Sequence, residues 1–235
     1  MNVEMVMQEL EALGKERTKK MYMSNGAHEP LFGVATGAMK PIAKKIKMNQ
    51  ALAEELYATG NYDAMYFAGI IADSNAMTVT DYNRWMDLAY FYMLSDYVVA
   101  VTLAEADIAQ EVADQWIASG EELRMSAGWS CYCWLLGNRS DVEFSESKIA
   151  NMLEIVKSTI HIAPERAKSA MNNFLYTVGI SYVPLHGLAI EIAKAVGPVE
   201  LKRDKKKSTI LHAYENIQKE VGKGRLGFKR KYVRC

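Results

Sequence analysis

The residues with the clearest chemical potential lie in one aromatic segment, DYNRWMDLAYFYMLSDYVVAVTLAE, at residues 81–105. Within this segment Asp96 stands among apolar neighbours, and Tyr92 precedes it by four residues. Because they are four residues apart, the carboxylate and the ring would lie on one helix face or across a helix start. Such a pair can address a cationic base or a sugar. Alternatively, Ser95 or Asp96 caps the helix that follows, because both residue types are common N-caps.

The patterns of common cofactor and metal sites are absent from the sequence. The four histidines are scattered and lack an i, i+4 partner on a helix. The glycine-containing stretch GVATGAMKP, at residues 33–41, lacks the Gly-Lys-Ser/Thr ending of a phosphate-binding loop. A Gly-x-Ser-x-Gly nucleophile motif does not occur. We therefore expect neither a cofactor nor a metal, which argues against the common cofactor enzymes.

Opposite charges are segregated along the chain, although the net charge is zero. Residues 14–47 hold 8 Lys and Arg against 2 acidic residues, and residues 201–235 hold 12 against 3. Residues 48–200 are acidic, with 20 Asp and Glu against 8 basic residues. The two basic ends would suit a phosphate backbone if the fold brought them to one face. Solvated basic tails are the alternative, and an acidic groove would instead favour a protein partner.

The elements that must position these residues are helices. The chain has 235 residues, of which 50% are apolar and only 5 are proline, a composition typical of long helices. Apolar spacing predicts a first helix from residue 3 towards Tyr22 and a basic helix over residues 38–47. Further helices are expected near 49–58, 61–72, 80–93, 96–108, 109–118, 120–137, 146–160, 164–179, 183–196 and 207–221.

Paired helices of this length cannot bury their apolar faces alone, so neighbouring pairs must stack. We predict an all-α fold, a superhelical solenoid of antiparallel HEAT/ARM-like helix pairs, as one domain over residues 1–225. An ordinary helical bundle stays open on periodicity alone. The glycine-rich, basic residues 226–235 are expected to form a flexible C-terminal arm that binds phosphate or is disordered.

The sequence also favours a particular compartment. The first residues lack a basic region before an apolar run, and no stretch approaches 18 apolar residues, so neither a signal peptide nor a membrane helix is expected. Cys131, Cys133 and Cys235 are interpreted as reduced thiols. These features predict a cytoplasmic protein without membrane contact, and we expect a monomer.

Three segments resemble the HEAT-like-repeat DNA alkylpurine glycosylases of the DNA alkylation repair family. LFGVATGAMKPIAKKIK, at residues 31–47, is similar to the family's early segment with its FGV start. Residues 66–96, which end in YFYMLSD, follow its pattern of a repeat helix, an acidic break, a Trp-bearing helix and a Trp-Asp-x-x-Asp motif. ELRMSAGWSCYCWLL, at residues 122–136, resembles its Arg-Ala-Gly-Phe helix. The similarity extends from about residue 5 to about residue 225.

The resemblance implies roles for residues in the aromatic segment. Asp96 falls on the family's catalytic carboxylate, and Tyr92 falls on the aromatic residue of the lesion pocket, where most members have Trp. Tyr22 would supply a further ring from the first helix pair. A carboxylate beside the sugar can stabilise oxocarbenium-like charge, and an aromatic ring can stack on a cationic alkylpurine.

Two positions depart from the family pattern. The family's catalytic-cleft Arg falls on Ser126, whereas Arg124 would point to a different helical face. A cleft Trp is replaced near Asn172 or Asn173, which makes Asn173 the candidate substrate contact at that position. Contacts to the DNA backbone are expected from Lys40, Lys44, Lys45, Arg124, Arg225, Lys229 and Arg230.

The sequence therefore supports three functions. The first is a DNA glycosylase that binds double-stranded, alkylated DNA and hydrolyses the N-glycosidic bond of cationic 3- or 7-alkylpurines. The second is a non-catalytic binder of distorted or branched DNA, for which the basic ends matter and Asp96 does not. The third is a solenoid that binds a protein partner.

Overall fold

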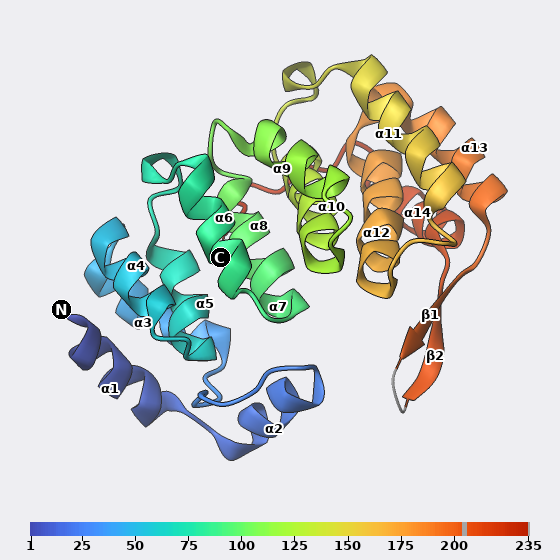
Figure 1. Cartoon of the computed structure of the whole chain (residues 1–235). Coiled ribbons are helices and arrows are strands. Elements are labelled where there is room, and N and C mark those ends of the chain that lie inside the picture. Colours follow the sequence, from blue (N-terminus) through green and yellow to red (C-terminus); the bar gives the residue numbers. More distant parts are fainter. Residues whose placement is uncertain (204–205, 235) are drawn as a thin grey trace. The chain divides into compact units, whose positions relative to one another are not determined.

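The computed structural model describes residues 1–203 and 206–234, with the side chains of residues 1–202 and 208–234; Cys235 lies outside the described residues. The chain forms two compact units (Figure 1). The first unit comprises Met1–Ile108 together with the chain end from Arg234, and the second comprises Ala109–Val233. A single domain over residues 1–225 therefore stays a prediction.

The first unit is built from helices joined by short turns. Asn2, Asn49, Asn61 and Thr78 cap four of these helices, each accepting a backbone N–H with its side-chain oxygen. The helices are α1 (Val3–Leu13), α2 (Glu16–Ser24), α3 (Thr36–Ile46), α4 (Gln50–Ala58), α5 (Tyr62–Ile71), α6 (Val79–Leu88), α7 (Tyr92–Leu94), a π-helical turn (Ser95–Val99) and α8 (Ala100–Leu103).

The long first helix predicted from the sequence is in fact two helices. The chain breaks at Gly14, where an added Cβ would lie only 2.6 Å from the carbonyl oxygen of Phe32. This close approach of two backbone segments requires glycine, so α1 ends before it and α2 begins at Glu16.

The second unit also consists of packed helices, with a hairpin inserted before the last one. Helix α10 packs against both α9 and α12. At Gly128 an added Cβ would lie 2.7 Å from the Ala113 carbonyl oxygen, which is why α9 and α10 can approach so closely. Its elements are α9 (Ala109–Ala118), α10 (Glu122–Leu136), α11 (Glu146–Thr159), α12 (Glu165–Ser181), α13 (His186–Val196), β1 (Val199–Arg203), β2 (Lys206–Leu211) and α14 (Ala213–Val221).

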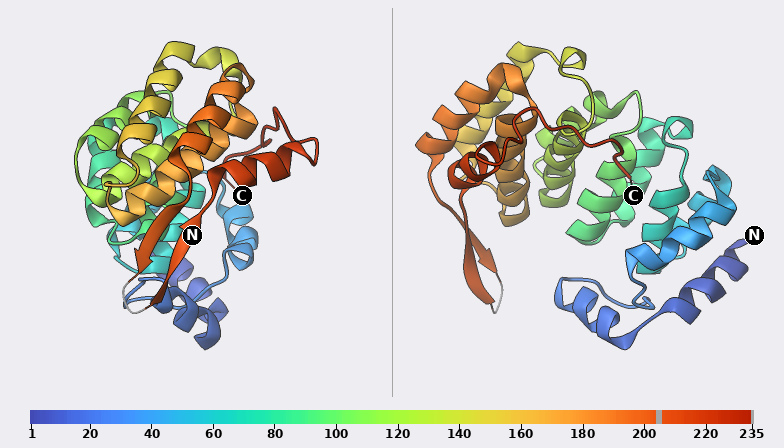
Figure 2. Two further views of the ribbon diagram at one scale, coloured as in Figure 1. Left: turned by 90° about the vertical axis from the view of Figure 1, so that its right-hand side faces the viewer. Right: turned by 180° about the vertical axis from the view of Figure 1, so that it is seen from behind.

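Large aromatic side chains fill the interior of both units. Trp85 in the first unit and Trp116, Trp129 and Phe174 in the second are almost completely buried. Cys131 on α10 is also buried, and both it and Cys133 are thiols. Figure 2 shows the stacked helices of each unit from two further directions. The prediction of an all-α fold made of HEAT-like helix pairs is confirmed, except for the hairpin.

The β-hairpin replaces the start of the helix predicted over residues 207–221. Strands β1 and β2 are antiparallel, with Val199 opposite Leu211 and Leu201 opposite Thr209. Val199 and Leu201 are buried while Glu200 between them is exposed, the alternation of a half-buried strand. Only from Ala213 does the chain become helical.

None of the described helices alone has the length and apolar content needed to cross a membrane. One bent pair, Glu165–Ser181 with Val183–Val196, meets these criteria by length and composition only.

Candidate functional site

Asp96 lies in the first unit, where the helical backbone changes its hydrogen-bonding pattern. Helix α7 leads into the π-helical turn Ser95–Val99, which continues into α8. Neither Ser95 nor Asp96 caps this helix, because the segment is helical on both sides of them and shows no side-chain cap. The N-cap alternative is therefore wrong. Such turns recur at functional sites because an extra residue re-aims the side chains that follow.

The Asp96 carboxylate is almost completely enclosed. Its side chain is 3% exposed, and the Ser95 hydroxyl donates a hydrogen bond to its Oδ1 at 2.8 Å. Burying a carboxylate is costly unless polar groups surround it, and the Ser95 hydroxyl supplies one such group at this position. The helix itself packs closely on α5, since a Cβ at Gly69 would lie 2.6 Å from a Val98 methyl group.

A continuous series of aromatic contacts runs through this part of the first unit. Ring centroids are 4.9 Å apart for Tyr22 and Tyr62, 5.3 Å for Tyr62 and Phe91, and 5.8 Å for Phe91 and Tyr92. Tyr92 then meets Tyr97 edge-on at 6.3 Å. Tyr22 and Tyr92, both predicted as site residues, thus belong to one array of rings. Tyr97 is 42% exposed and forms its outer end.

Tyr22 has a structural role and is not a surface residue. It is 7% exposed, and its hydroxyl donates a hydrogen bond to the Val34 carbonyl oxygen at 2.9 Å. Burial, reinforced by the nearby Asp63 carboxylate, raises the pKa of Tyr22 to about 12. Tyr22 therefore fixes the segment that leads into α3.

Asp63 is a polar residue of this region that the sequence analysis missed. Its buried carboxylate accepts three successive backbone N–H groups, from Phe32 at 2.6 Å, Gly33 at 2.9 Å and Val34 at 2.8 Å. Gly33 has a φ of +82°, and a Cβ there would lie 2.5 Å from the Lys19 nitrogen. The FGV start of the motif is thus a loop bound by a carboxylate. The only sequence signal was an Asp just after a cap residue, in an otherwise apolar helix.

Ser126 and Arg124, the predicted site residues on α10, are buried or ion-paired and so are poorly placed to contact a ligand. Ser126 on α10 is fully buried, and its hydroxyl donates to the Arg166 carbonyl oxygen at 3.4 Å. Arg124 forms an ion pair with Glu121 at 3.0 Å, and its side chain is 16% exposed. The position that carries the family's cleft Arg is therefore occupied by a packing residue, without a cation to contact a substrate.

Two adjacent asparagines of α12 have opposite environments. Asn173 is exposed, so it can meet a ligand at the surface. Asn172 is 4% exposed, and its Oδ1 has no hydrogen-bond partner among the described residues. The exposed member of the pair is the one that the sequence analysis selected.

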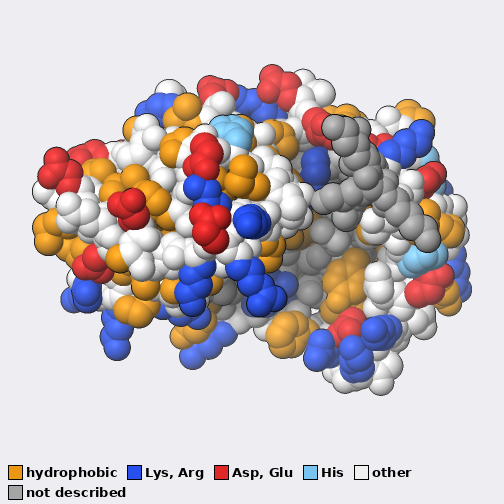
Figure 3. Space-filling view, turned by 90° about the horizontal axis from the view of Figure 1, so that it is seen from below, with side chains coloured by type: hydrophobic (Ala, Val, Ile, Leu, Met, Phe, Trp, Pro, Cys, Tyr) orange, Lys and Arg blue, Asp and Glu red, His pale blue; other side chains and the backbone are white. Residues whose placement is uncertain are grey.

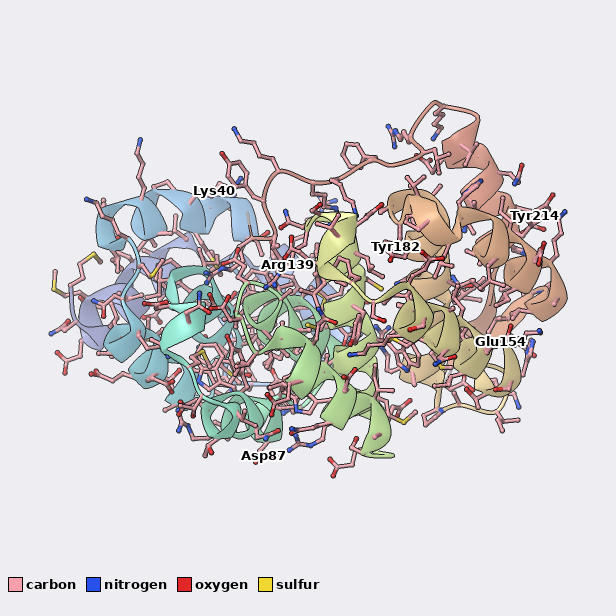
Figure 4. All side chains as sticks on the ribbon, turned by 90° about the horizontal axis from the view of Figure 1, so that it is seen from above. Lys40, Asp87, Arg139, Glu154, Tyr182 and Tyr214 are labelled. Atoms are coloured by element: carbon pink, nitrogen blue, oxygen red, sulfur yellow. The ribbon has the colours of Figure 1, made fainter. Side chains whose placement is uncertain are left out.

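The predicted backbone-binding lysines of the first unit all lie on α3. Lys40 and Lys44 are exposed, lie on one helix face and form no ion pair with the described residues. Lys45 is 3.6 Å from Glu9 at the surface. Figure 3 shows Lys and Arg side chains along the lower left border of the view, and Figure 4 labels Lys40 at the edge of the first unit. Helix α3 therefore presents uncompensated positive charge.

The predicted cations of the second unit are mostly paired. Arg225 is 2.6 Å from Glu220, and Lys229 is 2.6 Å from Asp141. Arg230 differs: its guanidinium lies 4.7 Å from the centre of the Trp134 ring. Within the C-terminal arm, the Gly227 and Arg230 N–H groups also form backbone hydrogen bonds to the rest of the second unit. The expected flexibility of the arm stays a prediction.

The final described residue, Arg234, is held within the first unit. Its guanidinium donates to the carbonyl oxygens of Gly69 and Ala72 at 2.8 Å each, and it forms an ion pair with Glu105. These carbonyls lie at the C-terminal end of α5, where a cation is favourable. The guanidinium of Arg234 therefore has a structural role in the first unit.

Comparison with known proteins places this geometry in a family. The family model of the DNA alkylation repair enzyme matches residues 6–217. The uncharacterized protein Lin0241 of Listeria innocua is 30% identical over 217 residues, covering 90% of this chain and 93% of its own. The uncharacterized protein Lmo0209 of Listeria monocytogenes is 28% identical, with the same coverage.

A solved structure is similar over the full length of both chains. It has 78% sequence identity, covers 100% of each chain and superposes with a TM-score of 0.97. It represents a new family of proteins related to the HEAT-like repeat DNA glycosylases with affinity for branched DNA structures. With a family model that spans most of its length, this chain belongs to the DNA alkylation repair enzyme family.

Proposed function

We propose that this protein binds branched DNA and that the exposed lysines of α3 contribute to this binding through the phosphate backbone. The observation that carries the proposal is the 78% identity, over the full length, to a protein with affinity for branched DNA structures. At this identity over the full length, a shared binding surface is the expected consequence.

The charge distribution supports the same proposal. Lys40 and Lys44 lie one turn apart on the solvent-exposed face of α3, and neither forms an ion pair with an acidic side chain among the described residues. A lysine that neutralises a phosphate releases bound counterions, which makes the affinity fall steeply with salt. Such contacts bind the backbone of any sequence, as recognition of a branch requires.

The loss of a cleft cation supports binding without efficient catalysis. Ser126 stands where the resemblance places the cleft Arg, and it is buried. Without this Arg, a substrate loses a charge-assisted hydrogen bond of about 1.5–3 kcal/mol. Branched DNA can still be bound, because its recognition does not depend on stabilising a transition state at one sugar.

Binding is tested with a labelled four-way junction and a duplex of the same sequence, titrated over a series of salt concentrations. We expect tighter binding of the junction. In the Lys40→Gln, Lys44→Gln variant the slope of log affinity against log salt should fall by about 2 in magnitude, because each phosphate that a lysine neutralises contributes about 0.9 to the slope.

The matched control is Lys157→Gln, because Glu154 already pairs with Lys157 at 3.1 Å on the surface of the second unit. This variant should keep the wild-type slope. Equal affinity for junction and duplex in the wild-type protein would refute the proposed function.

A second candidate function is alkylpurine excision, which is supported by the resemblance that places Asp96 at the family's catalytic carboxylate. Its carboxylate lies in the π-helical turn with Ser95 as a hydrogen-bond donor and Tyr92 one turn earlier. This is an arrangement that can stabilise positive charge on a sugar. The test is release of 3-methyladenine and 7-methylguanine from methylated duplex DNA at protein excess. Release that disappears in Asp96→Asn would establish catalysis, and no release from the wild type would exclude it.

A further inference from the structure

The C-terminal arm of the second unit combines exposed aromatic rings with basic side chains. Its sequence from Phe228 to Tyr232 reads FKRKY. The Phe228 side chain is 54% exposed and that of Tyr232 is 67% exposed. Aromatic rings bury large apolar areas when they have a partner, so two open rings in one short segment indicate a contact surface.

The backbone of this segment is nevertheless fixed. The Gly227 N–H donates to the Ile180 carbonyl oxygen, and the Arg230 N–H donates to that of Gly137, both at 2.7 Å. Asn138 returns a hydrogen bond to the Arg230 carbonyl oxygen at 2.7 Å. The rings are therefore presented on an ordered support, which lowers the entropy that a ligand would lose on binding them.

A lysine between the rings completes this support. The Lys229 ammonium group donates to the Leu136 carbonyl oxygen at 2.6 Å and pairs with Asp141 at 2.6 Å. Lys229 is partly buried, whereas its neighbour Phe228 is exposed.

The two remaining cations of the segment are not neutralised. Arg230 lies over the Trp134 ring, and the Lys231 ammonium group is 5.1 Å from the centre of the Tyr232 ring. Neither has a carboxylate partner among the described residues, unlike Lys229 with Asp141. Open aromatic rings beside open cations are the combination with which proteins bind single-stranded nucleic acid, through base stacking and phosphate contacts.

We propose that the C-terminal arm binds unpaired nucleotides of branched DNA, with Phe228 and Tyr232 stacking on bases and Arg230 and Lys231 contacting the adjoining phosphates. This inference rests on the proposed binding of branched DNA. Four residues of extended chain reach at most about 14 Å, the length of about four stacked nucleotides. The arm thus fits a short unpaired stretch at a branch point.

The experiment compares a variant of the full chain that lacks both aromatic rings of the arm with a variant that keeps them. Phe228→Leu with Tyr232→Leu keeps apolar side chains but removes both aromatic faces, whereas Tyr232→Phe keeps its ring. Leu226→Ala is the matched control, because Leu226 is 42% exposed on the same arm. Melting curves of all variants verify that the exposed substitutions leave the fold intact.

Affinity is measured by fluorescence anisotropy for a fork with two unpaired thymidine arms, a fully paired duplex and single-stranded oligothymidine. The double Leu variant should lose about 30-fold in affinity for the fork and the single strand, which corresponds to ~1 kcal/mol per ring. Its affinity for the duplex should stay unchanged. Tyr232→Phe and Leu226→Ala should bind all three as the wild type does.

Crosslinking supplies a direct readout that a purely structural role would not produce. With 5-iodouracil in the unpaired arms, irradiation should join the DNA to Phe228 or Tyr232, as identified by mass spectrometry. A wild-type preference for the fork that persists in the double Leu variant would overturn this inference alone. A wild-type protein without any preference for branched DNA would overturn the proposed function and this inference together.

Discussion

Helix α3 and the C-terminal arm are both strongly basic in sequence, yet their charges are in different physical states. On α3, Lys40 and Lys44 face solvent without an acidic partner among the described residues. In the arm, Lys229 is bound to Asp141 and to a main-chain oxygen, and only Arg230 and Lys231 keep their charge open. The net charge of a sequence segment therefore does not give the number of unpaired charges that the folded segment exposes to a ligand.

The difference assigns separate tasks to the two regions. Under the proposed binding of branched DNA, the positive charge of α3 adds affinity for any phosphate backbone, and this depends on the position of the helix. The arm uses part of its charge to order itself, and it offers ring faces that a duplex, with its bases stacked inside, cannot use. Changes that move α3 or release the arm should thus have different consequences.

The largest effect is expected from Asp63→Ala, which removes the carboxylate that binds the loop before α3. Three backbone N–H groups, of Phe32, Gly33 and Val34, lose their acceptor. The free energy of unfolding should fall by about 3 kcal/mol. Junction affinity should also fall, although every lysine of α3 is retained. Urea denaturation and anisotropy measure the two quantities.

Two further substitutions control this test. Asp63→Asn keeps one acceptor oxygen and should lose less stability than Asp63→Ala. Asp107→Ala removes an exposed carboxylate of the same unit and should change stability by at most about 0.5 kcal/mol. If Asp63→Ala bound junctions as well as the wild type while being less stable, the loop would not position α3.

A smaller effect is expected from Lys229→Ala, which removes the side chain that fixes the arm. Loss of its hydrogen bond to the Leu136 carbonyl oxygen and of its ion pair with Asp141 should cost about 1–2 kcal/mol, because the donor is charged and the group is mostly enclosed. Limited proteolysis should then cleave within residues 226–234. Lys231→Ala, on the exposed side of the arm, should be cleaved no faster than the wild type.

Tyr22→Phe tests the loop before α3 a second time, because the Tyr22 hydroxyl donates to the Val34 carbonyl oxygen and its contribution to stability depends on pH. Because the folded pKa of Tyr22 is raised to about 12, the neutral phenol is favoured in the folded chain. Its contribution to stability is complete below its ordinary pKa near 10 and is lost as the pH rises towards 12. The variant should lose about 1 kcal/mol at neutral pH and then decline less steeply than the wild type above pH 10. Parallel declines would contradict the assignment.

Local patterns in the sequence predicted much of the fold. Apolar spacing located α9, α10 and α12 within a few residues, because their buried faces repeat every three to four positions. It divided Tyr92 and Asp96 between two helices, near 80–93 and 96–108, whereas in the structure both lie in one continuous helical segment that begins at Tyr92. The hairpin was missed because the alternation of Val199, Glu200 and Leu201 is brief and runs into a cluster of lysines.

The missing parts of the site depend on contacts between distant positions. Asp63 meets a loop about thirty residues away, and Lys229 meets Asp141 across an even longer separation. The π-helical turn at Asp96 has no local signature of its own, because it depends on how this segment packs on α5. The burial of Ser126 likewise follows from the packing of α10 on α12, which one helix alone cannot specify.

The Lys40→Gln, Lys44→Gln variant should show the smallest change in stability, although it should reduce the salt dependence of junction binding. Both side chains are exposed and unpaired within the described residues, so only the interaction of Lys44 with the C-terminal end of α3 is removed. That interaction is worth less than about 1 kcal/mol. Urea denaturation should therefore give nearly wild-type stability while the salt slope of junction binding is reduced. A large loss of stability would mean that these lysines serve the fold, as Lys229 does, and the contrast between α3 and the arm would disappear.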